Sequence, residues 1–147
     1  MTVAVPLEEL QAALDRRSAL VYLLTVGDGG RPHCVAVRVA WRDSELEVRT
    51  GATSARNAEA RPSATLLAPP QPVGAGATEG AGRAETDDYS LIIDGDVTAI
   101  TKAPDGGAIA CVRPTHAVFH RPAHGHDGAA AHDCVPVFDH PGSGRTG

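Results

Sequence analysis

The first hydrophobic residues of the chain recur at helical spacing. Leu7, Leu10 and Leu14 are three and four positions apart, so they share one face of a helix. Pro6 suits the first helical position, and acidic residues precede basic ones along the segment, which complements the helix dipole. The pattern predicts an amphipathic helix over residues 6–17 with these three leucines buried.

Two strands joined by a tight reversal are predicted next. Residues 19–26 are a continuous apolar run of strand length, and the glycines within residues 27–32 tolerate the positive φ angles of a reversal. The returning segment, residues 33–41, alternates between two faces. One face carries Val35, Val37, Val39 and Trp41, and the other carries Ala36, Arg38 and Ala40. Arg38 is therefore an isolated charge on a face of small residues.

A third strand, a short helix and a fourth strand follow. The alternation over residues 45–50 places Thr50 on the inward face at the end of its strand. A short helix is expected over residues 54–60, because Pro62 disfavours helical backbone in the residue before it. Residues 63–68 are predicted to form the fourth strand.

Two longer strands are predicted in the second half of the chain. Residues 89–101 and 108–120 flank a turn at residues 105–107, and Pro114 indicates an edge or a β-bulge in the second strand. The inward face of the first strand is expected to carry Tyr89, Leu91, Ile93, Val97 and Ala99.

Six strands, a leading helix and one small helix after the third strand predict a mainly β protein built as a small antiparallel barrel. An open parallel sheet is disfavoured, because the crossover helices that it needs are missing. The barrel domain is expected to span residues 1–122. Residues 69–88, rich in Pro, Gly and Ala, are expected to be a mobile insertion, and residues 123–147 a His/Gly/Pro-rich disordered tail.

The composition supports one globular domain and disfavours several classes of function. The 147 residues include only one Trp, two Tyr and two Phe, so an aliphatic core is expected. A net charge of −5 with a single lysine argues against a nucleic-acid surface. No segment is long and apolar enough for a membrane helix, and the first residues lack the pattern of a secretion signal, so a soluble cytoplasmic protein is expected. Three widely spaced cysteines fit neither a disulfide framework nor a paired-cysteine metal site.

The candidate chemistry concentrates in "TGATSARN", residues 50–57. Ser54 occupies the position expected of a helix N-cap, so free backbone N–H groups and the helix dipole would point at one spot. The groups available there are the hydroxyls of Thr50, Thr53 and Ser54, the flexible Gly51, and the side chains of Arg56, Asn57 and Arg49. They suit a phosphate monoester. An ordinary capped helix with a solvated arginine explains the same residues, so both interpretations stay open.

The order of motifs resembles the pyridoxamine 5′-phosphate oxidase-like family, the FMN-binding split barrels. The resemblance is carried by "YLLTVGDGGRPHCVAVRVAW", "LEVRTGATSARNAEARPSATLL", "YSLIIDGDV" and "VRPTHAVFHRP", and it covers roughly residues 6–122. It implies an antiparallel six-stranded split β-barrel of the Greek-key type, and a homodimer with the cofactor at the subunit boundary. The cofactor-binding residues that it implies are Thr50, Gly51, Ser54, Ala55, Arg56 and Asn57, with Arg38 and Arg49 as further candidates.

The sequence departs from the family pattern on the second strand. The resemblance aligns Val35 and Ala40 with an arginine and a lysine that reach the cofactor in authentic pyridoxamine phosphate oxidases, and neither side chain can bind phosphate. Arg38 could substitute for them, or could form an ion pair at a dimer interface. Oxidation of vitamin B6 is therefore not expected.

Two other kinds of site have little support in the sequence. The tail carries His120, His124, His126, His132 and Cys134, but its spacing matches no defined zinc pattern, so no metal ligand is assigned. Ser90 shares a predicted strand with Asp94 and Asp96, but no histidine is expected close to them. Hydrolysis by a catalytic triad is therefore disfavoured.

The function expected from the resemblance is FMN-dependent oxidoreduction of an unidentified small molecule, with the cofactor carrying the reaction. No catalytic residue is assigned. The alternatives are a deazaflavin-dependent oxidoreductase of the same fold and a non-catalytic protein that binds flavin or haem.

Overall fold

The computed structural model describes residues 2–17, 20–70 and 89–121. The expected tail, and all but the first two residues of the expected insertion, lie outside these ranges.

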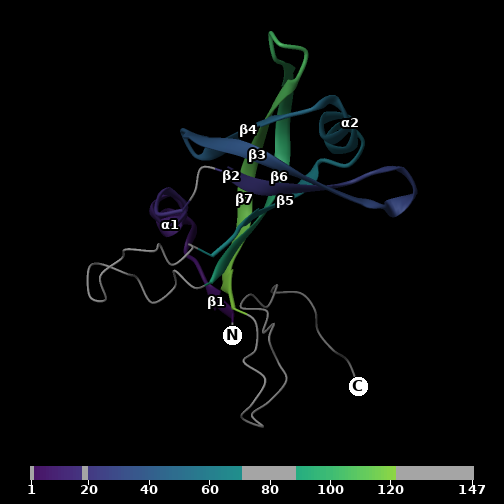
Figure 1. Cartoon of the computed structure of the whole chain (residues 1–147). Helices are drawn as coiled ribbons and strands as arrows, with labels where there is room; N and C mark the ends of the chain where they lie inside the picture. Colours follow the sequence, from purple (N-terminus) through teal and green to yellow (C-terminus); the bar gives the residue numbers. More distant parts are fainter. Residues whose placement is uncertain (1, 18–19, 71–88, 122–147) are drawn as a thin grey trace, which may run out of the picture.

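Six antiparallel strands close into a barrel, as the sequence predicts (Figure 1). They are β2 (Leu20–Val26), β3 (Pro32–Arg42), β4 (Glu45–Thr50), β5 (Ser63–Ala68), β6 (Ser90–Lys102) and β7 (Ala108–His120). The strand order is β7-β4-β3-β2-β5-β6, and β6 pairs again with β7, so the barrel has no free edge. The remaining elements are β1 (Thr2–Ala4), the 3-10 turns η1 (Leu7–Glu9) and η2 (Asp28–Gly30), and the helices α1 (Leu10–Asp15) and α2 (Ala52–Ala60). Figure 1 shows α1 and α2 on opposite sides of the barrel.

The N-terminal segment differs from the sequence prediction in two ways. The strand β1 was not predicted; it has only three residues, too few for a periodic signal, and it pairs with β7. The expected helix divides into η1 and α1, and the prediction that Leu7 is buried is wrong, since Leu7 is 45% exposed. A 3-10 turn has three residues per turn, which moves Leu7 out of phase with the buried Leu10 and Leu14.

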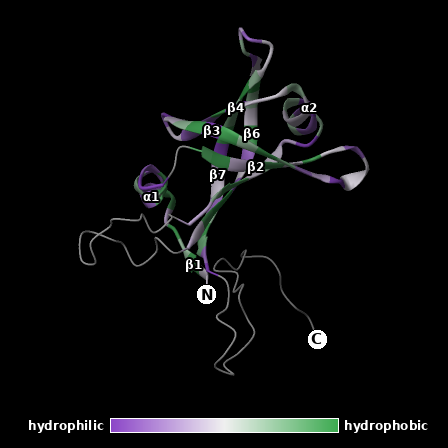
Figure 2. Ribbon diagram, in the orientation of Figure 1, coloured by the Kyte–Doolittle hydropathy of each residue, from purple (hydrophilic) through white to green (hydrophobic). Residues whose placement is uncertain are grey.

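The barrel interior is filled mainly by aliphatic side chains, in agreement with the composition. The largest fully buried ones are Leu10, Leu46, Leu66, Leu91, Ile93, Val21, Val48 and Val112. Figure 2 shows hydrophobic residues along the strands and more hydrophilic ones at the hairpin turns. The alternation in β3 and β4 is as predicted, with Val37 and Thr50 buried and Arg38 exposed.

The two long strands, β6 and β7, contain the irregularities that shape this side of the barrel. Their register shifts between Asp94 and Gly95 and again between Val97 and Ala99. The first shift lies opposite Pro114, so the predicted bulge is confirmed. The second shift breaks the alternation, and the prediction that Ala99 faces inward is wrong because Ala99 is exposed beyond it.

Gly95 allows the close approach of β6 and β7 at the first bulge. A Cβ atom there would lie 2.6 Å from the Arg113 carbonyl oxygen and 2.7 Å from Val112 Cγ1, both part of the packed strand β7. Only a residue without a side chain fits this contact.

We therefore expect Gly95→Ala to lower the free energy of unfolding by about 1–3 kcal/mol, since the strands must move apart to accept the methyl group. Urea unfolding measures the change. Gly51→Ala is the matched control, because a Cβ at Gly51 meets nothing within 4 Å. Equal unfolding midpoints for the two variants would contradict the close-approach argument.

Candidate functional site

The helix α2 begins directly after strand β4, with no intervening loop. Its N-cap is Gly51 (φ −88°, ψ 172°), so the prediction that Ser54 is the N-cap is wrong. Serine is a preferred cap, but the extended Gly51 lets the helix start two residues earlier, and the Ala55 N–H donates to the Gly51 carbonyl at 3.1 Å. Ser54 lies instead within the first turn and is buried.

A cavity of about 510 Å³ lies where β4 ends and α2 begins. Its wall is formed by His33, Val35, Ala36, Val37, Arg49, Thr50, Gly51, Ala52, Thr53, Ser54, Asp105 and Gly107. We call it the Thr50 cavity. It brings together one side of β3, the start of α2 and the turn between β6 and β7.

Two features of the Thr50 cavity suit an anionic oxygen. The Thr50 side chain is 7% exposed, and its Oγ1 has no hydrogen-bond partner. A buried hydroxyl without a partner is costly, so it is a strong candidate to meet a ligand. The N-cap of α2 is a glycine, so no side-chain capping hydrogen bond competes for the N–H groups of the first turn.

Arg49 contributes a positive charge to the same cavity, and that charge is paired. Its Nη2 donates to Asp105 Oδ2 at 2.6 Å, which ties the end of β4 to the β6–β7 turn. This hydrogen bond from Arg49, and a second from the Gly107 N–H, hold the pKa of the Asp105 carboxyl below its ordinary value. Both side chains are more than half exposed.

Arg56 lies outside the Thr50 cavity. Ser54 and Arg56 are two residues apart on α2, which separates them by about 200° around the helix axis. Arg56 lines a second cavity, of about 520 Å³, between α2 and the β6–β7 hairpin. Its lining residues are Ala52, Ala55, Arg56, Glu59, Ile100, Thr101, Lys102, Ala103, Gly106, Gly107 and Ala108. We call it the Arg56 cavity.

The structure therefore divides the expected cofactor-binding residues between two cavities. Arg49, Thr50, Gly51 and Ser54 line the Thr50 cavity, and Ala55 and Arg56 line the Arg56 cavity. Ala52 and Gly107 line both, so the two cavities adjoin at the first turn of α2.

Comparison with known sequences identifies close relatives. No protein-family model matches the chain. The uncharacterized proteins Mb0449c of Mycobacterium bovis and MT0457 of Mycobacterium tuberculosis are each 34% identical over 152 residues, covering 93% of this chain and 96% of the relative. The chain belongs to the same family as these two proteins.

Solved structures with the same fold are more distant in sequence. An F420 reductase superimposes with a TM-score of 0.54 at 21% identity, covering 71% of this chain and 93% of its own. An FAD-binding protein of Mesorhizobium loti gives 0.54 at 12% identity, covering 81% and 96%. A Clostridium acetobutylicum protein of the pyridoxinephosphate oxidase family gives 0.54 at 13% identity, covering 80% and 91%. The chain has the split-barrel fold of these proteins. The haem storage protein HutZ of Vibrio cholerae shares this fold, with a TM-score of 0.54 at 14% identity over 78% of this chain and 94% of its own.

In this split barrel, Asn57 has a structural contact. Its buried amide Nδ2 donates to Thr25 Oγ1 on β2 at 3.2 Å. A Cβ at Gly27 would lie 3.5 Å from Asn57 Oδ1, so the amide also packs against the start of the β2–β3 reversal. The expected role in cofactor binding would have to be shared with this contact between α2 and β2.

Arg38 lines neither cavity. It is exposed on β3, directly opposite Arg49 of β4 in the sheet. Like charges in this arrangement repel, and the pairing of Arg49 with Asp105 offsets the repulsion. Arg38 therefore lies on the outer face beside the Thr50 cavity.

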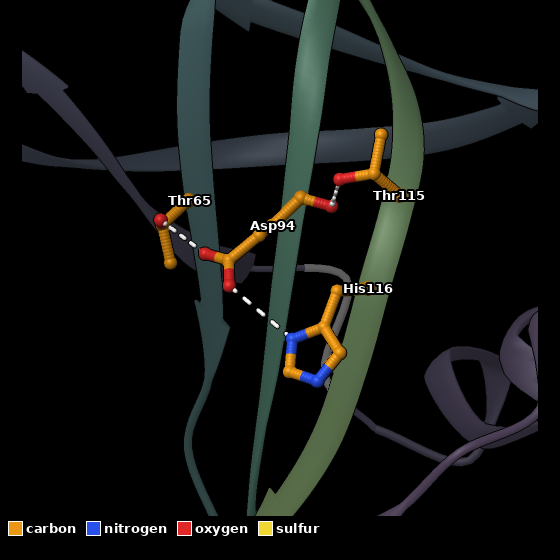
Figure 3. A network of polar contacts seen from close by, with 4 residues as sticks. All are labelled: Thr65, Asp94, Thr115 and His116. Carbon is orange, nitrogen blue, oxygen red and sulfur yellow. Dashed lines mark hydrogen bonds and ion pairs between the residues drawn. The ribbon is translucent and has the colours of Figure 1, made fainter. Parts of the chain in front are cut away.

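The split barrel also carries a polar network that the sequence did not reveal (Figure 3). Thr65 Oγ1 donates to Asp94 Oδ1 at 2.6 Å, His116 Nδ1 lies 3.4 Å from Asp94 Oδ2, and Thr115 Oγ1 donates to the Asp94 carbonyl at 3.2 Å. The expectation that Asp94 has no histidine nearby is wrong, because the bulged register places His116 opposite it. Both threonine hydroxyls donate to Asp94, so this network does not present a nucleophile activated by the imidazole.

Other classes of site are not found in the part of the chain that the structure describes. Within residues 2–17, 20–70 and 89–121, no three His, Cys, Asp or Glu side chains are grouped to hold a metal ion. Cys34 and Cys111, in the same ranges, have free thiols. None of the helices in these ranges has the length and hydropathy of a membrane span. The histidine-rich tail beyond Arg121 lies outside the described residues.

The Arg49–Asp105 pair gives a prediction for the acid titration of the split barrel. The folded pKa of Asp105 is lowered, so the pair stabilises the fold above the ordinary carboxyl pKa, and this contribution is lost as the pH falls through the folded value. In a carboxyl NMR titration, Asp105 should titrate below the usual aspartate range, and Arg49→Gln should raise its pKa. Arg42→Gln, which removes a pair with Glu47 instead, should leave Asp105 unchanged. An Asp105 titration insensitive to Arg49→Gln would contradict this.

Proposed function

We propose that the Thr50 cavity binds the phosphate of a flavin or deazaflavin coenzyme, and that the protein is an oxidoreductase acting on a small molecule. The observation that carries the proposal is the buried, unpartnered Thr50 hydroxyl beside the uncapped N-terminus of α2. Together they offer hydrogen-bond donors and a favourable dipole to one anionic group.

The cavity has polar and charged groups for the phosphate and an apolar wall for the ring of the coenzyme. Thr50 Oγ1 would donate to a phosphate oxygen, and the backbone N–H groups at the start of α2 would donate to others. Arg49 adds a guanidinium on the same side. On β3, Val35 and Ala36 give the cavity an apolar wall that suits a flat ring.

The chemistry would be supplied by the coenzyme, which exchanges a hydride with the substrate. The protein would bind it, orient it and limit access of water. FMN carries the single phosphate that the Thr50 cavity would bind. A deazaflavin coenzyme is the alternative, supported by the similarity to an F420 reductase. The family resemblance aligns Val35 and Ala40 with basic residues of the authentic oxidases, so vitamin B6 oxidation is not proposed.

A haem-binding role is the second candidate, in which the protein would not be an enzyme. It is supported by the similarity to HutZ and by His33, whose imidazole is a potential iron ligand on the wall of the Thr50 cavity. The first measurement is therefore the absorbance spectrum of the protein after reconstitution. Flavin or deazaflavin bands favour the oxidoreductase, a Soret band favours haem, and a protein that binds none of them contradicts both.

We also propose that the protein works as a homodimer. The outer face of β2 and β3 exposes Leu20 (46%) and Tyr22 (43%) beside the small residues Ala36 and Ala40. Tyr22 lies opposite Ala36 in the sheet, and Ala36 also lines the Thr50 cavity. A second copy on this face would bury apolar area and bring the coenzyme to the subunit boundary.

The Thr50→Val variant tests the coenzyme site. It preserves the side-chain shape and removes the hydroxyl, so FMN affinity should fall about tenfold or more, because a hydrogen bond to a charged group contributes about 1.5–3 kcal/mol. Riboflavin, which has no phosphate, should bind both proteins equally in the same titration. Free Thr50→Val should be no less stable than the parent, because the buried hydroxyl has no partner to lose. Unchanged FMN affinity would remove Thr50 from the site.

The dimer is tested by placing a charge on the proposed interface. Tyr22→Glu should convert the dimer to a monomer in light scattering, because an unpaired carboxylate would be buried between copies. The control is Leu7→Glu, a residue of similar exposure (45%) on η1, which should remain dimeric. A monomeric parent protein at micromolar concentration would contradict the proposal.

A further inference from the structure

The Arg56 cavity lies on the other side of α2 from the Thr50 cavity, and the single-phosphate proposal leaves it unused. Its floor is apolar, with Ala55, Ala103 and Ala108 buried. Its walls come from α2 and from the end of the β6–β7 hairpin, which lie side by side (Figure 1).

Two cations share this cavity. Arg56 comes from α2 and Lys102, the one lysine of the chain, from the end of β6. In the described residues neither has an ion pair or a side-chain hydrogen bond, in contrast to Arg49. The only carboxylate on the cavity wall is Glu59, so positive charge exceeds negative charge there, although the whole protein is acidic.

The backbone N–H groups of the turn after Lys102 are already used in hydrogen bonds, so a ligand would have to be recognised by side chains. The Ala103 and Gly106 N–H groups donate to carbonyls within the turn, and the Gly107 N–H donates to Asp105. Recognition in this cavity would therefore rest on the guanidinium of Arg56, the ammonium of Lys102 and the hydroxyl of Thr101.

The walls of the two cavities share Ala52 and Gly107, so the cavities adjoin at the first turn of α2. A ligand whose phosphate lies at Thr50 can therefore extend around the first turn of α2 toward Arg56. FMN, with one phosphate, would leave the two cations without an anion.

We propose that the Arg56 cavity binds a second anionic group of the same coenzyme, and that Lys102 determines specificity for coenzymes that carry one. The inference rests on the proposed coenzyme site. The shared chemistry is an anionic extension beyond the first phosphate, which is either the pyrophosphate of a dinucleotide or the carboxylates of an acidic tail.

Lys102→Met tests the specificity, because it keeps most of the side-chain volume and removes the charge of an exposed residue. Riboflavin, FMN, FAD and F420 are titrated against both proteins. We expect FMN affinity to change less than twofold and the affinity for FAD or F420, whichever is preferred, to fall about tenfold or more with a weaker salt dependence. Arg113→Met, at an exposed position of β7 outside both cavities, should change none of them.

The single lysine also allows a direct test that does not depend on a coenzyme. Reductive methylation with ¹³C keeps the charge and labels Lys102 as the one lysine signal, with the N-terminal amine resolved separately. Inorganic pyrophosphate should shift the Lys102 signal at a lower concentration than phosphate, and Arg56→Gln should abolish the difference.

The outcomes separate the two proposals. A parent protein that binds no flavin or deazaflavin contradicts the coenzyme proposal, whatever Lys102 does. Coenzyme binding with no effect of Lys102→Met, or with equal losses for FMN and for the larger coenzymes, overturns the specificity proposal. A Lys102 signal that pyrophosphate does not shift overturns it as well.

Discussion

The pairing of β6 with β7 is the interaction on which the rest of the molecule depends. Each strand has 13 residues, and each also pairs with a further barrel strand, β5 on one side and β4 on the other. Without this pairing, the remaining strands would be an open sheet with two free edges. The contact is close because Gly95 brings β6 within van der Waals distance of the β7 backbone. Closure of the barrel therefore depends on the close approach of the β6 and β7 backbones at Gly95.

The candidate site follows from where this closed barrel stops. Strand β4 ends at Thr50, level with the start of β7 at Ala108, while β3 continues past that point. The chain must turn across the open end, and Gly51 allows α2 to start there immediately. The inward hydroxyl of Thr50 and the first turn of α2 consequently meet at the mouth of the barrel. The polar groups of the site therefore come from the end of β4 and the start of α2, and no separate loop supplies them.

The sequence predicted the elements that depend on local periodicity. Strand alternation predicted the inward faces of β3 and β4, including Thr50. The glycines predicted the turns between β2 and β3 and between β6 and β7. It did not give features that depend on register or rotation. The helix α2 begins two residues earlier than predicted, and its rotation places Ser54 and Arg56 about 200° apart, so the two side chains line different cavities. Likewise, Asp94 and His116 meet only because a bulge shifts β6 against β7.

The ion pair between Arg49 and Asp105 bears on how any anion would enter the Thr50 cavity. Arg49 already holds a carboxylate of the same chain at 2.6 Å. The bond uses Nη2 of Arg49, and a guanidinium has five N–H donors, so an anion bound in the Thr50 cavity would share Arg49 with Asp105. The Asp105 carboxylate would weaken the attraction of Arg49 for that anion, which favours ligands with more charge than one carboxylate. An anion that attracted Arg49 more strongly than Asp105 does would loosen the tie between the β6–β7 turn and the end of β4, so occupation of the cavity and mobility of that turn would be linked thermodynamically.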